Sequence, residues 1–526
     1  MIKLFKPIVY LALVTFPITF SGCSEENREI PEQKEEVKVD SPVETPVVTA
    51  DTEMNETIDA YLSTHYLWND EYQGMKRDLN IPYVDSYDNF LQTTLMSMST
   101  NNLDKKMDDA TGKYTLYSYV DRKEKKKSTR GLTAGVNHGY EKEDKIKSYG
   151  ISNLAIVSFL DEQGMPTGYY GFAVQSVYPA SAASTFGVER GTFIYEVNGE
   201  AINKDNYISL YLELIEPTQS SVKLLVGKDT EDPEDVTLMT TEIDPTPILM
   251  QTIFEEGNHK IGYLVYESFD AAYDNDLLDV LASFKTAGIT DLVLDLRYNG
   301  GGHVISSMML AGCLAGSNCK NQVFQYYRYN KARMERVEQT KKETGNDYDS
   351  SAKYFYDNFV YDNYYGVNLD RYNLSQSNLY ILTGEFTASS SEILVNSLRG
   401  IGVPITTIGE RTRGKNVGME IMDFDKGNYS YELIPITFQY YNAQKETVPE
   451  NGLPADYEVA DWSNGYVNFG ENHEPMLAKA LELITKKKSA VAYTRSASPV
   501  RVQPVSTALP ALKHQHPQGA VVYQSK

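Results

Sequence analysis

The stretch that decides the fold is residues 378–419, NLYILTGEFTASSSEILVNSLRGIGVPITTIGERTRGKNVGM. Its apolar run 379–383 is short and β-rich, which predicts a buried strand. A turn of small residues follows, and apolar residues then recur at helical spacing until glycines 400 and 402. A second apolar run, 405–409, predicts a neighbouring strand. This alternation predicts an α/β core.

Two residues in this stretch could carry chemistry. Ser389 lies at the strand-to-helix turn, where backbone N–H groups point outward and can stabilise an oxyanion. Lys415 follows the second strand between glycines 414 and 418, so it reaches the same edge of the sheet. A serine hydroxyl needs a base, and a lysine can be that base if burial lowers its pKa from about 10.4 to roughly 7–8. Taken singly, the serine also fits a helix cap and the lysine a surface residue.

These residues resemble the C-terminal processing (tail-specific) protease family, whose members use a Ser/Lys dyad. Residues 387–393, TASSSEI, match the family's small-Ala-Ser-Ala-Ser-Glu-Ile turn, which selects Ser389 as the nucleophile. Residues 409–415, GERTRGK, are similar to its Gly-Glu-Pro-Thr-x-Gly-Lys segment, which implies Lys415 as the general base. The family often has a glutamine four residues after the lysine, and this chain has Met419 there.

A glycine-rich turn precedes this stretch. Residues 291–302, DLVLDLRYNGGG, predict a buried strand that ends in a turn before a helix at 304–314. The turn lacks Gly-Lys-Ser/Thr, which excludes a Walker-type nucleotide site. It resembles the family's Asp-Leu-Arg-x-Asn-x-Gly-Gly motif. That resemblance implies an oxyanion hole made by the N–H of Gly301 or Gly302 with that of Ser390.

His303 adjoins this turn and offers a competing Ser/His mechanism, of the kind that the related tricorn-type proteases use. Those enzymes place their histidine on the strand that matches residues 262–266, where this chain has none. We therefore favour Lys415 as the base. Asp295 and Arg297 are expected to brace the turn.

Residues 148–240 read as short strands with a helix of small residues, and they resemble a PDZ domain. PDZ domains bind chain ends by β-augmentation and hold the terminal carboxylate on backbone N–H groups of a glycine-containing loop. The resemblance implies that Tyr149, Gly150 and Ile151 form this peptide-binding loop. The alternative is a PDZ-like spacer without a ligand.

The first residues predict export. Two lysines precede the apolar run 8–20, which is too short for a comfortable membrane span. The end of this segment resembles a bacterial lipobox, which implies a signal peptide at 1–22 and a lipid-modified Cys23. A plain secretory signal is the alternative. Residues 23–50 read as a disordered tether, so we expect a protein anchored to the bacterial outer membrane, on its periplasmic or outer side.

Composition limits the partners. Lysine and arginine number 49 against 72 aspartates and glutamates, a formal net charge of −23, which argues against nucleic acid or an anionic membrane surface as a partner. We expect polypeptide substrates, membrane contact through the lipid alone, and no metal or organic cofactor. Cys313 and Cys319 could form a small-loop disulfide or remain two unrelated thiols.

The sequence pattern divides the rest of the chain into further regions. Residues 51–147 predict a helical N-terminal region, and 250–485 the catalytic domain, which by resemblance is a crotonase-like α/β fold. Residues 321–377 form a long connection between the glycine turn and the serine strand, which suits a substrate-covering insertion or a surface decoration. Residues 486–526 lack periodicity and are expected to be a disordered tail.

The sequence thus predicts an exported, lipid-anchored serine endopeptidase with a PDZ-like domain. One alternative is a non-catalytic, peptide-binding lipoprotein, which Met419 favours and the intact Ser389 and Lys415 oppose. Another is a surface glycan-binding protein, which rests on the expected location and the 40 tyrosines.

Overall fold

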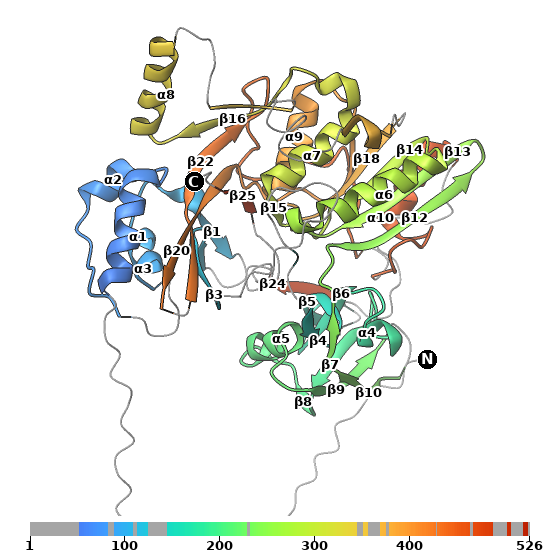
Figure 1. Cartoon of the computed structure of the whole chain (residues 1–526). Helices are drawn as coiled ribbons and strands as arrows, with labels where there is room; N and C mark the ends of the chain where they lie inside the picture. Colours follow the sequence, from blue (N-terminus) through green and yellow to red (C-terminus); the bar gives the residue numbers. More distant parts are fainter. Residues whose placement is uncertain are drawn as a thin grey trace, which may run out of the picture. The chain divides into compact units, whose positions relative to one another are not determined.

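The computed structural model describes most of the chain from residue 52 onward (Figure 1). The described residues are 52–82, 89–108, 113–124, 142, 145–161, 163–228, 232–344, 351–355, 369–374, 378–427, 429–462, 466–487, 502–506 and 519–523. The expected signal peptide, the lipid-modified Cys23 and the tether at 23–50 lie outside them. No helix of the described residues is both long and apolar enough to cross a membrane.

A six-stranded sheet forms the centre of the region expected to be catalytic. Its order is β12-β13-β14-β18-β19-β23; β12 is antiparallel to β13, and every later pair is parallel. The strands expected at 379–383 and 405–409 are neighbours in it, β18 and β19. The six strands are β12 (Ile248–Glu256), β13 (His259–Tyr266), β14 (Asp291–Asp295), β18 (Asn378–Thr383), β19 (Thr406–Gly409) and β23 (Tyr457–Glu458).

Helices cover both faces of this sheet, which is why its strands are nearly continuous apolar runs. One face packs on α6, α7 and α9 through residues such as Leu292 and Ile381. The other face packs on α10 through residues such as Val293 and Leu382 (Figure 1). The helical elements are η2 (Ala271–Tyr273), α6 (Asp274–Ala287), α7 (Val304–Ala315), η3 (Gly316–Cys319), α9 (Ser390–Gly400) and α10 (Pro475–Thr485).

An eight-stranded sheet carries the end of the glycine turn and the strand after Lys415. Its path is β15-β25-β20-β22-β16-β17, and β21 pairs with both β20 and β3. Strand β25 therefore lies between β15 and β20. The strands are β3 (Tyr119–Glu124), β15 (Gly301–His303), β16 (Val323–Tyr329), β17 (Ala352–Tyr354), β20 (Val417–Lys426), β21 (Tyr429–Ile434), β22 (Ile436–Tyr441) and β25 (Gly519–Tyr523).

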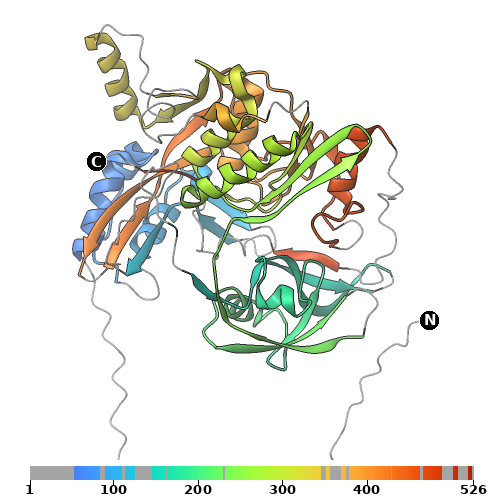
Figure 2. The ribbon, with the colours of Figure 1, turned by 45° about the vertical axis from the view of Figure 1, so that its right-hand side comes forward.

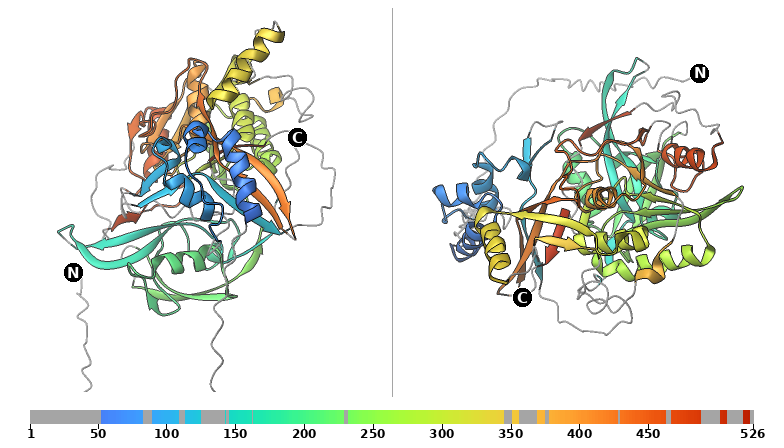
Figure 3. Two further views of the ribbon diagram at one scale, coloured as in Figure 1. Left: turned by 90° about the vertical axis from the view of Figure 1, so that its left-hand side faces the viewer. Right: turned by 90° about the horizontal axis from the view of Figure 1, so that it is seen from above.

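The N-terminal elements pack on that sheet (Figure 3, left). Apolar residues such as Ile58 and Leu62 share one buried cluster with Met419 and Leu433. Sequence pattern predicts the helices here, whereas strand β3 is held by pairing with distant β21. The elements are α1 (Thr52–His65), α2 (Asn69–Gly74), α3 (Asn89–Met96), η1 (Asn102–Asp104), β1 (Lys105–Asp108) and β2 (Lys113–Leu116).

A seven-stranded sheet lies in the region expected to be PDZ-like (Figure 2, green and teal). Its path is β10-β9-β7-β6-β5-β24, with β8 paired to β7. Where the chain enters and leaves this region, β4 (Ile146–Ser148) pairs with β11 (Thr241–Ile243). The other elements are β5 (Ile151–Leu160), β6 (Pro166–Val177), α4 (Ala182–Thr185), β7 (Phe193–Val197), β8 (Glu200–Ala201), α5 (Tyr207–Ile215), β9 (Ser221–Gly227), β10 (Glu234–Met239) and β24 (Val502–Ser506).

The insertion at 321–377 begins as part of a sheet. Strand β16 pairs with β22, and it is followed by α8 (Lys331–Thr344), β17 and η5 (Leu369–Tyr372). Among the described side chains of α8 only Val337 is buried, so this helix projects into solvent (Figure 3). Cys313 and Cys319, which precede the insertion, are separate buried thiols and not a disulfide.

The expectation of a disordered tail over residues 486–526 is wrong for two short segments, which form strands β24 and β25. Strand β24 pairs with β5, and β25 pairs with β15 and β20. Strand pairing is held by backbone hydrogen bonds, which require no apolar periodicity in the sequence. That is why the composition of the tail did not reveal these strands.

Candidate active site

Ser389 lies in a strained turn between β18 and α9. Its φ of 57° and ψ of −110° are unusual for a residue with a side chain. The residue is fully buried, and its Oγ has no hydrogen-bond partner among the described residues. A buried hydroxyl without a partner is costly to keep, and such groups are common at reactive sites.

The two serines that follow Ser389 have hydroxyls that are already hydrogen-bonded. Ser390 Oγ donates to the carbonyl oxygen of Gly302 at 2.7 Å. Ser391 Oγ donates to the carbonyl oxygen of Asn299 at 3.0 Å. Both hydroxyls therefore hold the glycine turn against the serine turn, which leaves the hydroxyl of Ser389 as the available nucleophile of the three.

Lys415 is buried between β19 and β20, with 4% of its surface exposed. Its Nζ lies 3.6 Å from the Sδ of Met419 and 4.2 Å from the centre of the Tyr117 ring. Burial is the main cause that lowers the pKa of Lys415. The charge of Arg413 also lowers this pKa and the charge of Asp104 raises it in part, so that the net pKa is about 7. A thioether is a weak acceptor, so Met419 gives the charged ammonium little compensation.

Glu392 joins the serine turn to the lysine turn. Its Oε2 accepts the backbone N–H of Ser389 at 2.8 Å and that of Lys415 at 2.9 Å. Its Oε1 accepts the N–H of Gly414 at 2.7 Å and the hydroxyl of Thr412 at 2.5 Å. Burial raises the pKa of Glu392 although these donors oppose the shift. One carboxylate thus sets the position of both candidate catalytic residues.

Sequence reasoning missed this role of Glu392. The signal that could have found it is the spacing Ser-x-x-Glu at a helix start, which is typical of a capping box. A second bridge comes from Tyr440 on β22, whose hydroxyl donates to the carbonyl oxygen of Lys415 and lies 3.5 Å from that of Ser389.

The N-terminal region supplies one wall of the lysine site, which the sequence also did not indicate. Tyr117 covers Nζ, and Asp104 lies near enough to raise the pKa of Lys415. Asp104 is itself buried, and its carboxylate accepts the hydroxyls of Tyr66 and Ser118, each at 2.7 Å. Burial raises the pKa of Asp104 to about 6. No motif connects these residues to Lys415, because the contact spans some three hundred positions of the chain.

The glycine turn lies against the serine turn. A Cβ on Gly301, whose φ is +105°, would come within 3.0 Å of Ser390 N and Ser389 Cβ. However, the N–H of Gly301 donates to Asn299 Oδ1 at 2.9 Å. A short turn bond thus already uses the hydrogen of the Gly301 N–H, which favours Gly302 of the two glycines expected as alternative oxyanion donors. Gly302, with a φ of +128°, and Ser390 remain the candidate donors.

His303 is held away from a catalytic role. Its Nδ1 accepts the backbone N–H of Ala271 at 3.0 Å, and Asp270 lies 3.9 Å from the same nitrogen. The described residues show no hydrogen bond between this imidazole and Ser389 Oγ. The geometry favours a positioning role for His303 between the glycine turn and η2.

A buried ion cluster braces the strand ends, as expected for Asp295 and Arg297. The Arg297 guanidinium contacts Asp295 at 2.7 Å, Glu474 at 2.6 Å and Asp461 at 2.5 Å. Arg190, from the seven-stranded sheet, contacts Asp461 at 2.5 Å. Burial alone raises the pKa of Asp461, but Arg190 and Arg297 hold it below its ordinary value. We call these five residues the Arg297 cluster.

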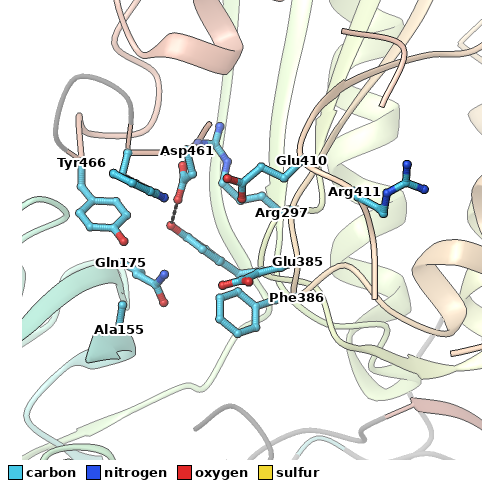
Figure 4. A pocket seen from close by; sticks show the side chains of 12 residues that line it. Ala155, Gln175, Arg297, Glu385, Phe386, Glu410, Arg411, Asp461 and Tyr466 are labelled. Carbon is cyan, nitrogen blue, oxygen red and sulfur yellow. Dashed lines mark hydrogen bonds and ion pairs between the residues drawn. The ribbon is translucent and has the colours of Figure 1, made fainter. Parts of the chain in front are cut away.

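A cavity of about 360 Å³ lies beside this cluster (Figure 4). Glu385 and Glu410 line it, and burial raises the pKa of both, that of Glu410 to about 7. Neither Ser389 nor Lys415 is among its lining residues, so the cavity is separate from the two candidate catalytic residues. The lining residues are Ala155, Gln175, Arg297, Tyr298, Gly384, Glu385, Phe386, Glu410, Arg411, Asp461, Trp462 and Tyr466.

The loop expected to bind a terminal carboxylate is engaged internally. Tyr149 and Ile151 are fully buried, and the N–H of Gly150 donates to Ser148 Oγ at 2.9 Å. The hydroxyl of Tyr149 donates to the carbonyl oxygen of Gln219 at 3.0 Å. The N–H of Gly150 is thus already engaged within the protein, and carboxylate binding by residues 149–151 stays a prediction.

Comparison with known proteins agrees with this geometry. Residues 260–459 match the model of Peptidase family S41. The carboxyl-terminal-processing protease of Picosynechococcus sp. is 22% identical over 324 residues, which cover 61% of this chain and 68% of that protein. The crystal structure of a protein from Bacteroides fragilis NCTC 9343, assigned to the S41 proteases, shares the fold with a TM-score of 0.58 and 24% identity, covering 82% of this chain and 97% of that one. Residues 260–459 of this chain are therefore a peptidase S41 domain, and the chain is a serine-type peptidase.

Proposed function

We propose that this chain is an endopeptidase in which Ser389 is the nucleophile and Lys415 the general base. The observation that carries the proposal is the environment of Lys415: a buried amine with a pKa of about 7, tied through Glu392 to the backbone of Ser389. Near neutral pH a large share of such an amine is uncharged and can accept a proton.

The reaction follows from these positions. Neutral Lys415 takes the proton of Ser389 Oγ as that oxygen attacks a peptide carbonyl carbon, and the ammonium then protonates the leaving amine. Backbone N–H groups of Gly302 and Ser390 stabilise the oxyanion. Water attacks the acyl-enzyme with the lysine again as base, which restores the serine. Because Nζ lies against Met419 Sδ and Ser389 Oγ has no partner, a side-chain rotation must bring the two groups together.

The strained turn supports Ser389 in this role. Its φ of 57° holds the residue between a strand and a helix, and the hydroxyls of Ser390 and Ser391 are committed elsewhere. The core is proposed to be crotonase-like, with helices on both faces of a mostly parallel sheet. No residue of the proposed mechanism requires a metal or an organic cofactor.

The substrate is proposed to be an exported polypeptide that reaches the enzyme as an unfolded chain or a chain end. The seven-stranded sheet with α4 and α5 supports a PDZ-like role in which a peptide adds to a strand edge. Export and anchoring through Cys23 rest on the lysines, the apolar run and the lipobox-like end of residues 1–23.

The test is cleavage of an unfolded protein, followed by mass spectrometry of the fragments. Wild type is compared with Ser389→Ala, Lys415→Ala and the control Lys426→Ala, which changes a lysine further along β20. We expect fragments from wild type and the control, and none from the other two. Full activity of Lys415→Ala would overturn the lysine assignment. Binding of the unfolded protein without cleavage by any form would favour a peptide-binding protein.

A further inference from the structure

The C-terminal segment of the chain enters two of its sheets. Strand β24 pairs antiparallel with β5, placing Val502 opposite Phe159 and Pro504 opposite Val157. In the sheet order β24 follows β5 at the end of the path, so it covers the backbone edge of β5 (Figure 2, red strand). This is the geometry by which PDZ domains take up a peptide: an added strand.

Side chains also hold β24. Val505 packs on the core of the seven-stranded sheet, to which Ile156 belongs. Val502 packs on a separate cluster that includes Val157. Two valines thus contact two apolar clusters from one strand. The pairing combines backbone hydrogen bonding with apolar burial, as a bound peptide would.

Strand β25 lies between the two elements that flank the proposed catalytic site. It runs parallel to β15, with Ala520 opposite Gly302 and Val521 opposite His303. It also runs parallel to β20, with Ala520 opposite Gly418 and Val521 opposite Met419. The tail therefore joins the glycine turn to the strand that begins two residues after Lys415 (Figure 1).

This position is one that a substrate chain would need. Strands β15 and β20 have no direct pairing in the sheet, and each offers backbone groups toward the place where β25 lies. A peptide approaching Gly302 and Lys415 in extended form would have to pair with the same edges. Because the tail belongs to the same chain, it would compete with such a peptide at an effective concentration of the order of millimolar.

We propose that strands β24 and β25 are a built-in competitor of the substrate: β24 pairs with the β5 edge, and β25 fills the strand position beside Gly302 and Lys415. The proposal rests on the proposed function, because it needs cleavage to take place between β15 and β20. It predicts a resting enzyme that becomes active when β25 leaves. Residues 519–523, GAVVY, include no charged residue, and β25 is held by backbone pairing with β15 and β20.

The test compares the full chain with a form that ends at Ser506, lacking β25, and a form that ends at Lys487, lacking both strands. We expect kcat/KM on an unfolded protein to rise by about tenfold or more in both, with most of the change in KM. Val521→Pro removes a backbone donor from β25 and should raise activity, whereas Ala511→Pro, outside both strands, should not. Thermal unfolding of each form shows whether it remains folded.

A synthetic peptide of residues 500–526 provides the second arm. It should inhibit the form ending at Lys487 competitively, and a scrambled peptide should not. The same labelled peptide should bind Ser389→Ala ending at Lys487, measured by fluorescence anisotropy. Unchanged activity on truncation together with no peptide binding would overturn the proposal. If no form cleaves any substrate, the proposed function fails, and the anisotropy measurement still decides whether the tail binds there.

Discussion

Two buried polar sites in this molecule differ in how their charges are compensated. In the Arg297 cluster every carboxylate meets a guanidinium, and Arg297 alone contacts Asp295, Asp461 and Glu474. At the candidate active site Ser389 Oγ has no partner among the described residues, and Lys415 has a thioether and an aromatic ring. Pairing holds Asp461 charged, whereas burial without pairing drives Lys415 toward its neutral form.

Buried charges that are fully paired stabilise the fold, whereas buried groups without full pairing are available for chemistry. Removing one partner of a paired cluster leaves the others charged and buried, which costs stability. Removing a poorly compensated lysine relieves a desolvation cost while it removes a base. Substitutions at the two sites should therefore separate stability from activity.

The largest expected effect is that of Lys415→Met. Losing a general base should lower kcat/KM by about 10²- to 10⁴-fold. Stability should be unchanged or higher, because an apolar side chain of similar length replaces an amine that burial disfavours. Peptidase assays and urea unfolding check both parts, with Lys426→Met as the control. A strongly destabilised Lys415→Met protein would contradict the comparison.

Arg297→Met should have the opposite signature. It leaves Asp295, Asp461 and Glu474 without their shared guanidinium, and the free energy of unfolding should fall by about 3–5 kcal/mol. Urea unfolding measures this, and Arg336→Met, on the exposed face of α8, is the matched control. A loss no larger than that of the control would show that the cluster does not brace the fold.

The effect of Glu392→Gln on kcat/KM should be smaller than that of Lys415→Met. The amide keeps one acceptor, but its NH2 faces backbone N–H groups, so the serine and lysine turns loosen and kcat/KM should fall by about 10- to 100-fold. The charge of Glu392 raises the pKa of Lys415, so its removal should also move the acidic limb of the pH–rate profile to lower pH. Glu335→Gln on α8 is the control. If the variant is slower but the acidic limb of its pH–rate profile does not move, Glu392 has a structural role only.

Met419→Gln should have the smallest effect. A carbonyl oxygen is a better acceptor for an ammonium than a thioether, so the pKa of Lys415 should rise by less than about one unit. The acidic limb of the pH–rate profile then moves to higher pH. Met419→Leu has no acceptor, so it should not raise the pKa of Lys415. Equal profiles for the two variants would exclude the contact with Sδ as a determinant of that pKa.

Local sequence predicted the parts of the site that rest on local structure. The strand-turn-helix around Ser389 and the strand before Lys415 follow from apolar periodicity and glycine placement. Helix α7 begins at residue 304, where the pattern places its start, and ends one residue beyond the expected 314.

Long-range contacts and backbone hydrogen bonds could not be predicted from the sequence. Nothing near Tyr117 or Asp104 indicates that they enclose Lys415, because only the fold brings them there. The commitment of the Gly301 N–H to Asn299 depends on one turn geometry. Strands β24 and β25 are held mainly by backbone pairing, which leaves little trace in composition.

In the proposed mechanism Lys415 is neutral near pH 7 and activates Ser389. The most direct measurement is the rate at which a fluorophosphonate labels Ser389, followed by mass spectrometry of the peptide from pH 5 to 10. In wild type the rate should rise with pH as Lys415 loses its proton, with an apparent pKa of about 7, and Lys415→Ala should react slowly throughout. A rise centred near pH 10, or the same profile in Lys415→Ala, would contradict the account.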